Sequence, residues 1–256
     1  MFGLITGSGF YRLPGLQDVS ETTTVTPYGE VRLTTGRWHG HEISFLPRHG
    51  SGHSIPPHAI NYRANVWALA DAGVEAIIAT AVSGGITEQM APGALVLISD
   101  FLEFTTGRDV TFFDGVIEPG FGSGSTTVNH TDMTDAYDPR LRAALRRAAA
   151  EGNIPVVDGG VYCTTNGPRF ETPAEIAMLA RAGGDLVGMT GYPEVALARE
   201  AGLRYASVGV ISNWAAGLGD ANLAIDEIMA VIEGASDRLY RLIGRAIGYD
   251  GTGTFE

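Results

Sequence analysis

The chain of 256 residues is long enough for one large α/β domain, and its 45% apolar, 9% aromatic and 18% charged residues are ordinary for a globular protein. Its formal net charge of −12 disfavours a polyanionic partner, so we expect no binding to nucleic acid. Cys163 is the only cysteine, which excludes an intrachain disulfide, and the N-terminus lacks the pattern of a signal peptide. The most apolar region, 66–82, is interrupted by polar residues and glycine and cannot span a bilayer unaided. We therefore expect a cytoplasmic protein without a membrane partner.

Short apolar runs in the first half of the chain predict a series of β-strands. They lie at residues 2–6, 31–35, 43–47, 76–80 and 94–99. The second and third flank residues 36–41 as in a β-hairpin, and apolar residues recur at helical spacing over 58–72. Residues 82–85, Val-Ser-Gly-Gly, predict a turn of small residues, or else residues 80–85 offer backbone N–H groups to a ligand at the end of a strand.

The second half of the chain predicts helices that alternate with strands. Asp138 and Pro139 are a cap and a first helical residue, while Thr172 and Glu175 form a capping box that opens a helix ending near 182. Residues 105–134 are rich in Gly, Thr and Asp and predict a long loop. Further strands are expected at 156–165, 186–189 and 205–212, and further helices at 193–201 and 222–247. The alternation predicts a single α/β domain over residues 1–256.

The Gly-Ser-Gly stretch at residues 7–9 ends the first predicted strand and invites a nucleotide-binding interpretation. The dinucleotide fingerprint requires a third glycine and a helix directly after the turn, but Arg12 stands at that third position. A P-loop is excluded because no Gly-Lys-Ser/Thr follows. The stretch is then either a plain turn or a small loop in which Ser8 and backbone N–H groups hold an anion.

A second candidate anion site lies in the stretch LPRHGSGH. Arg48 offers the fixed bidentate donor that suits phosphate, and His49 beside it can add a donor. Alternatively, Arg48 pairs with a structural carboxylate and the histidines, including His53 and His58, lie on the surface. We expect no metal, because the histidine spacing fits no helix-face pair and no cysteine or carboxylate ligands cluster nearby.

Three further stretches carry candidate site residues. Phe170 and Glu171 lie just outside a well-capped helix, where an aromatic ring can stack on a base and a carboxylate can accept its N–H groups. Glu175 already has a structural role in the capping box. Met189 and Thr190 lie between a strand and a helix start, and Asn213 follows an apolar strand with both a donor and an acceptor. Taken alone, Phe170 could equally be a core residue and Glu171 a solvated one.

The order of these motifs closely resembles the trimeric purine nucleoside phosphorylase and methylthioadenosine phosphorylase family. The motifs, over nearly the whole chain, are Gly7-Ser8-Gly9, Arg48-His49-Gly50, Asn61-Tyr62-Arg63-Ala64-Asn65, Gly167-Pro168-Arg169-Phe170-Glu171-Thr172, Met189-Thr190 with Pro193-Glu194-Val195, and Asn213. The resemblance implies a mixed, barrel-like β-sheet flanked by helices, assembled as a homotrimer. It implies a pentosyltransferase in which phosphate, as co-substrate, attacks the anomeric carbon of a purine nucleoside, without a metal or organic cofactor.

The resemblance also implies roles for particular residues. Phosphate would be held by Ser8, Arg48, His49 and Thr190, with backbone around Ala81 and Val82. Related enzymes carry Thr or Asn at the position of Ala81, so that side-chain contact is absent here. The nucleoside would be contacted by Phe170, Glu171, Met189, Asn213, Trp214 and Ala215. Glu171 and Asn213 would be the catalytic residues, since they fix the base and stabilise its developing negative charge.

Three departures from methylthioadenosine phosphorylases concern the purine. Those enzymes carry aspartate at Asn213, a second acid at Ala215 and a small hydroxyl residue at Glu171, whereas phosphorylases of hypoxanthine and guanine nucleosides have the Glu and Asn found here. Hypoxanthine carries a hydrogen on N1 that Glu171 can accept, but adenine N1 is itself an acceptor. A polar mismatch of this kind discriminates by roughly four to five orders of magnitude. The sequence therefore predicts a 6-oxopurine.

The residues expected around the 5′ group of the nucleoside, unlike those around the purine, resemble methylthioadenosine phosphorylases. No histidine occurs in the stretch 221–226, and Leu223 and Ile225 stand where methylthioadenosine phosphorylases have small apolar residues. The two halves together predict S-methyl-5′-thioinosine as the substrate. Leu223 and Ile225 could instead be core residues of the last helix, and His53, from the same or a neighbouring subunit, could restore a polar 5′ contact. Inosine or guanosine, and methylthioadenosine, remain alternatives, as do a nucleosidase and a non-catalytic nucleoside-binding protein.

Overall fold

The computed structural model describes residues 1–50, 52–121, 128–219 and 225–250. Its strands are β1 (Phe2–Thr6), β2 (Gln17–Thr26), β3 (Gly29–Trp38), β4 (His41–Pro47), β5 (Ala76–Gly85), β6 (Leu95–Leu97), β7 (Asp100–Phe104), β8 (Val157–Asp158), β9 (Val161–Thr165), β10 (Leu186–Gly188) and β11 (Arg204–Trp214). Its helices are α1 (Tyr62–Asp71), α2 (Pro139–Glu151), α3 (Pro173–Arg181), α4 (Gly191–Glu200) and α5 (Ile225–Asp250), with a 3₁₀ turn at Pro57–Ala59. Among these residues no helix is long and apolar enough to cross a membrane.

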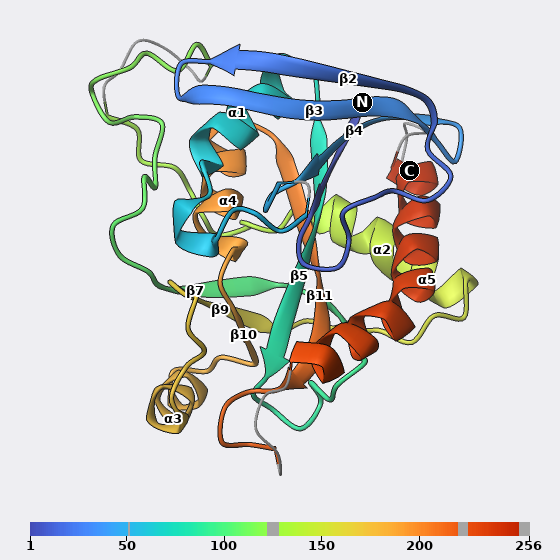
Figure 1. The fold of residues 1–256 in the computed structure, drawn as a ribbon, viewed down its shortest axis with the longest axis vertical. Coiled ribbons are helices and arrows are strands. Elements are labelled where there is room, and N and C mark those ends of the chain that lie inside the picture. The colour runs from blue at the N-terminus through green and yellow to red at the C-terminus, as the bar shows by residue number, and fades with distance from the viewer. Residues whose placement is uncertain (51, 122–127, 220–224, 251–256) are drawn as a thin grey trace.

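All of the described strands join one mixed sheet with β5 at its centre. The main path runs β2-β3-β4-β1-β5-β10-β9-β7, and β11 lies parallel to β5 and carries β6 and β8. In Figure 1, α1 and α4 cover one side of β5 and β11, and α2 and α5 cover the other. This arrangement of helices on a large mixed sheet confirms the predicted fold class.

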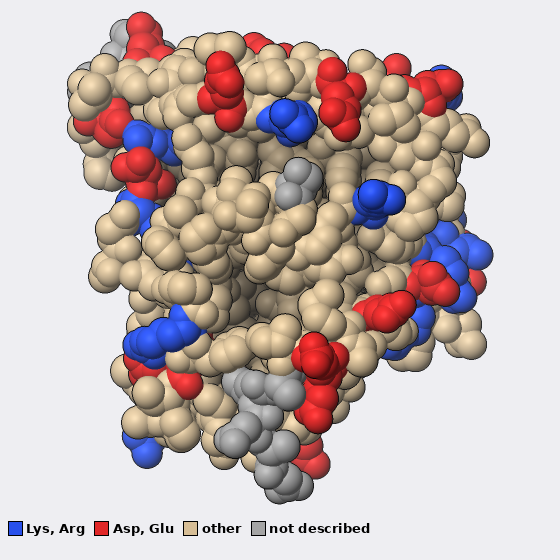
Figure 2. All heavy atoms as spheres, viewed as in Figure 1, with Lys and Arg blue, Asp and Glu red and all other residues tan. Residues whose placement is uncertain are grey.

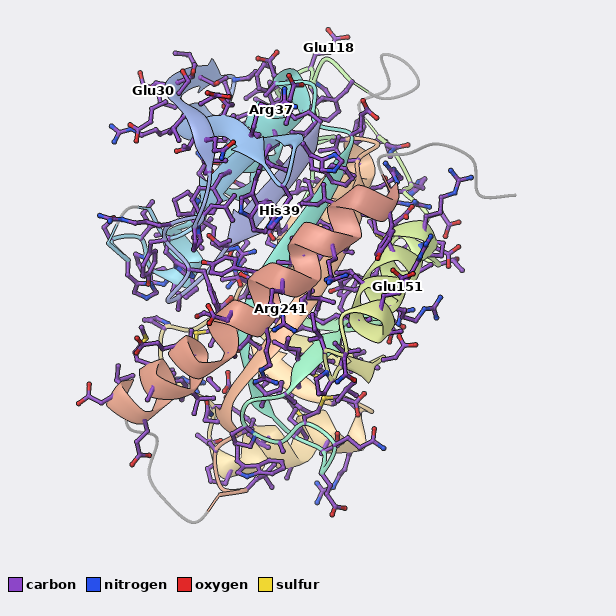
Figure 3. All side chains as sticks on the ribbon, turned by 90° about the vertical axis from the view of Figure 1, so that its right-hand side faces the viewer. Glu30, Arg37, His39, Glu118, Glu151 and Arg241 are labelled. Carbon is purple, nitrogen blue, oxygen red and sulfur yellow. The ribbon has the colours of Figure 1, made fainter. Side chains whose placement is uncertain are left out.

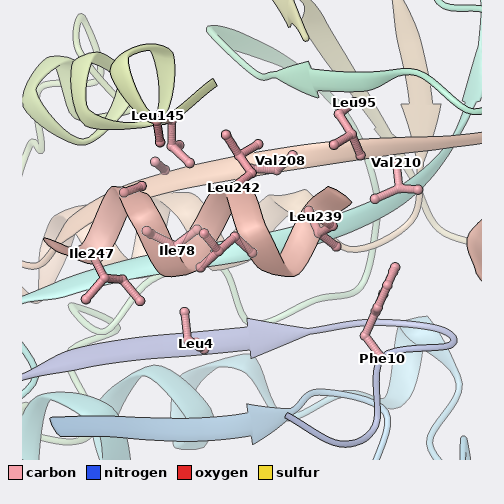
Figure 4. Close-up of a cluster of buried hydrophobic side chains, with 14 of the residues drawn as sticks. Leu4, Phe10, Ile78, Leu95, Leu145, Val208, Val210, Leu239, Leu242 and Ile247 are labelled. Carbon is pink, nitrogen blue, oxygen red and sulfur yellow. The ribbon is translucent and has the colours of Figure 1, made fainter. Parts of the chain in front are cut away.

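Side chains of the central strands alternate between two cores. Ile78 of β5 and Val208 of β11 pack with α2 and α5, together with Leu145, Leu242 and other apolar residues (Figure 4). The neighbouring Ile77 of β5 packs in the opposite direction, toward α1 and α4. Burial on both faces explains why these strands have near-continuous apolar sequences. Figure 3 shows α5 alongside α2, where Arg241 donates to the carbonyl oxygen of Gly152.

The predicted helix starts are confirmed where the sequence carries a cap. The Asp138 side chain accepts from the backbone N–H of Leu141, and Thr172 and Glu175 form both bonds of the capping box. The helix expected over 58–72 begins later, at Tyr62. Prolines precede a 3₁₀ turn there, and Asn61 provides the cap by accepting from the N–H of Ala64.

The turn predicted at 82–85 is wrong, because β5 continues to Gly85. Gly84 and Gly85 pair with β10 on one edge and β11 on the other, whereas residues 80–83 pair with β11 alone. Glycine is required at 85, since a Cβ there would lie 1.8 Å from the Met90 carbonyl oxygen. The strand expected over 156–165 is divided into β8 and β9 at Gly159, whose φ is +105°. Strands β2 and β7 were not predicted.

Candidate active site

A cavity of about 500 Å³ lies where the carboxyl ends of several strands converge. Its walls come from the loops after β1 and β4, the end of β5, the loop before α3, the β10–α4 junction, the end of β11 and the start of α5. The face seen in Figure 2 is hollowed, and the surface around the hollow is mostly uncharged. Such a concave site with a few convergent polar groups is typical of a small-molecule binding site.

The Gly-Ser-Gly stretch lies at this cavity and beside Arg48. Gly7 and Ser8 line the cavity, and the Gly7 N–H donates to Thr80 Oγ1 at 3.2 Å. A Cβ on Gly7 would lie 2.9 Å from Arg48 Nη1, so the absence of a side chain lets the guanidinium approach the loop. The stretch is a turn, since the Phe10 N–H donates to the Gly7 carbonyl oxygen at 3.1 Å, and it lies at the cavity, so anion binding by Ser8 stays a prediction.

The Arg48 guanidinium is buried and bound to the carboxylate of Glu194, which belongs to one of the motifs above but had no predicted role. Its Nε donates to Glu194 Oε2 at 2.8 Å and its Nη2 donates to Glu194 Oε1 at 2.7 Å. Its Nη1 donates to the Thr80 carbonyl oxygen at 2.7 Å. Burial favours a lower pKa for Arg48, but the bidentate Glu194 carboxylate offsets this and the pKa is raised. Arg48 therefore stays charged, and it both lines the cavity and pairs with a structural carboxylate.

His49 has a fixed tautomer. Its Nδ1 lies 2.8 Å from the Ile55 carbonyl oxygen, which only accepts, so Nδ1 carries the proton. Burial, opposed by this bond and aided by Arg48, lowers the pKa of His49 to about 4. At neutral pH its Nε2 is therefore an acceptor, not the donor that the sequence predicted. The His53 ring lies 4.6 Å from the His49 ring in the same chain, and its Nδ1 is 2.8 Å from the Tyr11 hydroxyl.

Met189 and Thr190 lie at the junction of β10 and α4, as the sequence predicted. Both line the cavity. Thr190 is the residue before α4, but its side chain makes no capping bond, so the hydroxyl is not used to start the helix. Arg108, which the sequence did not single out, donates to the Met189 carbonyl oxygen at 2.8 Å.

Phe170 and Glu171 line the cavity just before α3. Phe170 is 40% exposed, so it is not a core residue, and Glu171 Oε1 accepts from Thr165 Oγ1 at 2.5 Å. Glu175 instead binds Arg169 and the Thr172 N–H, which together lower the pKa of Glu175 to about 2. Its exclusion from the site agrees with this structural role.

Asn213 lies within β11 rather than after it, at an irregularity in the pairing with β5. Ile211 pairs with Ser83 and Asn213 with Gly84, which leaves Ser212 as the extra residue of a bulge. Ser212 Oγ donates to Asn213 Oδ1 at 2.6 Å, and Asn213 Nδ2 donates to the Trp214 carbonyl oxygen at 2.8 Å. One N–H of the amide remains for a ligand.

Some predicted contacts are not brought to the cavity. Ala215 and Val82 line it, but Ala81 and Trp214 do not. Ala81 is buried in the core beneath α1 and α4, on the other face of β5 from Val82. Trp214 lies near Gly219, where a Cβ would be 3.3 Å from the Trp214 Cβ. Alternation along a strand turns the Ala81 and Trp214 side chains away from the cavity. Residues 80–83 pair with β11 but with neither β1 nor β10, so the predicted phosphate contact of the backbone around Ala81 and Val82 stays a prediction.

The start of α5 forms an apolar wall of the cavity. Ile225, Ile228, Met229 and Ile232 line it at helical spacing. Leu223 lies outside the described residues. Only Ile225 of this wall was predicted. The i, i+3, i+4, i+7 pattern was visible in the sequence, but it does not distinguish a pocket wall from a core face.

Comparisons with known proteins agree with this site. Residues 1–248 match the Phosphorylase superfamily. The chain is 44% identical to the 6-oxopurine nucleoside phosphorylase of Pyrococcus furiosus, over 95% of this chain and 91% of that protein. It is 46% identical to the probable S-methyl-5′-thioinosine phosphorylase of Methanopyrus kandleri, over 96% and 91%. The methylthioadenosine phosphorylase of Schistosoma mansoni in complex with adenine superposes with a TM-score of 0.90 at 33% identity, covering 99% of this chain and 92% of that one. The resemblance seen in the motifs is confirmed, and the chain belongs to the Phosphorylase superfamily.

Proposed function

We propose that the protein catalyses phosphorolysis of a 6-oxopurine nucleoside, with S-methyl-5′-thioinosine as the preferred substrate. The products are hypoxanthine and 5-methylthioribose 1-phosphate. The observation that carries the proposal is one cavity in which Glu171 and Asn213 lie with Ser8, Arg48, His49 and Thr190. Relatives that bear the names 6-oxopurine nucleoside phosphorylase and probable S-methyl-5′-thioinosine phosphorylase support it.

Strand β5 sets the distance between the two groups of residues. Arg48 bonds the carbonyl oxygen of Thr80, and Asn213 pairs with Gly84 on the same strand. Four residues of extended chain span roughly 13 Å. A nucleoside fits this span with its base toward Asn213 and its anomeric carbon toward a phosphate at Arg48.

The purine end supports a 6-oxopurine. Hypoxanthine N1–H donates to the Glu171 carboxylate, and the free N–H of Asn213 donates to N7. As the glycosidic bond breaks, the sugar becomes oxocarbenium-like and negative charge moves into the purine, where the Asn213 bond strengthens. Adenine would place its N1 lone pair against the Glu171 carboxylate, an unpaired contact that weakens the transition state.

The phosphate end supports a reaction that uses phosphate rather than water. Arg48 and the Ser8 and Thr190 hydroxyls donate to the oxyanion, and His49 Nε2 accepts from the protonated oxygen of HPO₄²⁻. Phosphate is itself the nucleophile, so placement replaces a general base. The chemistry needs no metal or organic cofactor. A nucleosidase or a non-catalytic binding protein would have no use for this donor set.

The 5′ end supports methylthio over hydroxyl, because Ile225, Ile228 and Met229 offer an apolar surface. The Tyr11 and His53 pair also lines the cavity and could bond a 5′-hydroxyl, so inosine or guanosine is the second candidate substrate. We further propose a cytoplasmic homotrimer that serves purine salvage. Support for this assembly is the family resemblance, and sedimentation equilibrium measures it.

The deciding experiment compares base release from S-methyl-5′-thioinosine, inosine and 5′-methylthioadenosine, each with and without phosphate. We expect the methylthioinosine reaction to be fastest and to stop without phosphate. Faster cleavage of inosine would retain the purine assignment and overturn the apolar 5′ pocket. Faster cleavage of methylthioadenosine would overturn the roles of Glu171 and Asn213. Cleavage without phosphate would establish a nucleosidase.

A further inference from the structure

Glu194 is a buried carboxylate that holds the phosphate-facing arginine but does not itself line the cavity. It lies in the first turn of α4 and is 1% exposed, and Arg48 is 2% exposed. The two side chains meet through two parallel hydrogen bonds of 2.8 and 2.7 Å. This planar fork–fork geometry fixes the guanidinium in orientation as well as in position.

Tyr205 also binds this carboxylate. Its hydroxyl donates to Glu194 Oε1 at 2.8 Å, and the side chain is 2% exposed on β11. Oε1 therefore accepts from both Arg48 and Tyr205, while Oε2 accepts from Arg48. The pair is anchored to the central sheet through Tyr205 and to the β10–α4 junction through Glu194 itself.

The fork leaves a defined set of donors on Arg48. A guanidinium has five N–H groups. Two bind Glu194 and one binds the Thr80 carbonyl oxygen, which leaves one N–H on Nη1 and one on Nη2. Nη1 lies 2.9 Å from where a Gly7 Cβ would be, beside Ser8. Nη1, which keeps one N–H, therefore lies at the Gly7-Ser8 loop.

The same pair balances charge at this end of the cavity. Arg48 is the only Lys or Arg among the described residues that line the cavity, and Glu194 offsets its charge. A phosphate dianion would then be held by oriented hydrogen bonds rather than by an excess of positive charge. Orientation of Arg48 consequently matters more here than it would in a cluster of cations.

We propose that Glu194 is a positioning residue for the phosphate co-substrate, acting through Arg48 and braced by Tyr205. The inference rests on the proposed function for its kinetic test. Without the carboxylate, the guanidinium keeps its bond to Thr80 but loses the fork that sets its plane. Phosphate binding weakens, while the purine end, where Glu171 and Asn213 have hydrogen bonds of their own, is left as it is.

The test is Glu194→Gln, which keeps the side-chain volume and removes the charge. We expect the KM for phosphate to rise about tenfold and the KM for nucleoside at saturating phosphate to stay within about twofold. The matched control is Glu42→Gln, an exposed glutamate on β4, which leaves both constants unchanged. Equal changes in the two KM values, or no change in that for phosphate, would overturn the proposal.

A double-mutant cycle tests whether Glu194 acts through Arg48. Arg48→Lys removes the fork, so adding Glu194→Gln should change kcat/KM for phosphate by less than about twofold. Additive losses would count against the positioning role. If Glu194→Gln does not fold, Tyr205→Phe decides the matter: the KM for phosphate should rise about threefold, since one bond to Oε1 is lost. An unchanged KM in that variant would also overturn the role.

Calorimetric titration with inorganic phosphate separates this inference from the proposed function. If the native protein releases no base from any nucleoside, the proposed function fails, but phosphate binding to native and Glu194→Gln protein still measures positioning. If the native protein is active and both proteins bind phosphate equally, only the role of Glu194 fails.

Discussion

Arg108 Nη2 donates a hydrogen bond of 2.8 Å to the carbonyl oxygen of Met189. The same guanidinium donates to the carbonyl oxygens of Thr165 and Asn166 at 3.3 and 3.1 Å, and to that of Tyr192. One side chain thus joins the end of β9 to the start of α4, next to Met189 in the cavity wall.

We expect Arg108→Met to weaken nucleoside turnover although the side chain does not line the cavity. Loss of these bonds should lower kcat/KM for the nucleoside about tenfold and the free energy of unfolding by about 2 kcal/mol, because the carbonyl groups lose their donors. Steady-state kinetics and urea unfolding measure the two effects. Arg32→Met, at an exposed position of β3, is the control. Native kinetics in Arg108→Met would refute the bridging role.

Glu171→Gln should weaken the preference for 6-oxopurines. The glutamine Oε1 keeps the Thr165 hydroxyl, which turns the NH₂ toward the base and offers adenine N1 a donor. We expect the ratio of kcat/KM for methylthioinosine over methylthioadenosine to fall about 100-fold, the value of a charge-assisted hydrogen bond. Glu175→Gln is the matched control: it should cost stability through the capping box and leave the ratio unchanged. A constant ratio in Glu171→Gln would remove this residue from base recognition.

The lowered pKa of His49 predicts that the free energy of unfolding depends on pH. An unfolded histidine takes up a proton near pH 6.5, but burial lowers the pKa of folded His49 to about 4. Between these values the unfolded state binds more protons, so stability present above pH 6.5 is lost as the pH falls toward 4, on the order of 3 kcal/mol. His49→Gln keeps a donor for Ile55 and should lack this loss. Urea unfolding of both proteins from pH 7 to pH 4 tests it, and parallel curves would contradict it.

We expect Met229 to contribute to the preference for a 5′-methylthio group over a 5′-hydroxyl group. Met229→Gln keeps the shape of the wall but places an amide where a methylthio group would lie. We expect kcat/KM for methylthioinosine relative to inosine to fall about tenfold, since burial of a group of that size contributes about 1–2 kcal/mol. Met178→Gln, at an exposed position of α3, should leave the ratio unchanged. If both variants retain the native ratio, the 5′ group does not reach α5.

Gly9 and Gly15 form a matched pair for backbone strain. Both have positive φ, +82° and +76°, but only at Gly9 would a Cβ meet another residue, at 2.6 Å from Ile232 Cγ2. Gly15→Ala should lower the free energy of unfolding by about 1 kcal/mol, and Gly9→Ala by about 2–4 kcal/mol, because overpacking against α5 adds to the strain. Equal losses in thermal or urea unfolding would show that the contact with Ile232 is unimportant.

Local signals in the sequence are sufficient to predict the helices and strands that carry their own caps or periodicity. The helices opened by Asp138 and Thr172 were predicted because a cap is defined within four residues. The extension of β5 through Gly85 was not, because the partners that satisfy its backbone, β10 and β11, lie about 100 residues or more away in the chain. Glycine and serine there are typical of turns, and tertiary pairing overrode that preference.

In the candidate site, too, local sequence marks some residues, while others are defined only by contacts between distant segments. The sequence indicated Arg48, but its partner Glu194 is 146 residues away and carries no local mark of its role. Arg108 lies in a loop rich in Gly, Thr and Asp, where an arginine is ordinarily a surface residue. The exact partner of a buried charge depends on how distant segments meet, and no spacing rule within one segment encodes it.

The cavity draws its walls from Gly7 near one end of the chain and Ile232 near the other. During synthesis, a nascent chain that has not yet released α5 from the ribosome therefore has the proposed phosphate donors but lacks one wall of the cavity. On the proposed function, a bound nucleoside stabilises most the chain in which α5 has docked. Protease resistance gained on adding nucleoside would consequently report the completion of folding, not merely the presence of the central sheet.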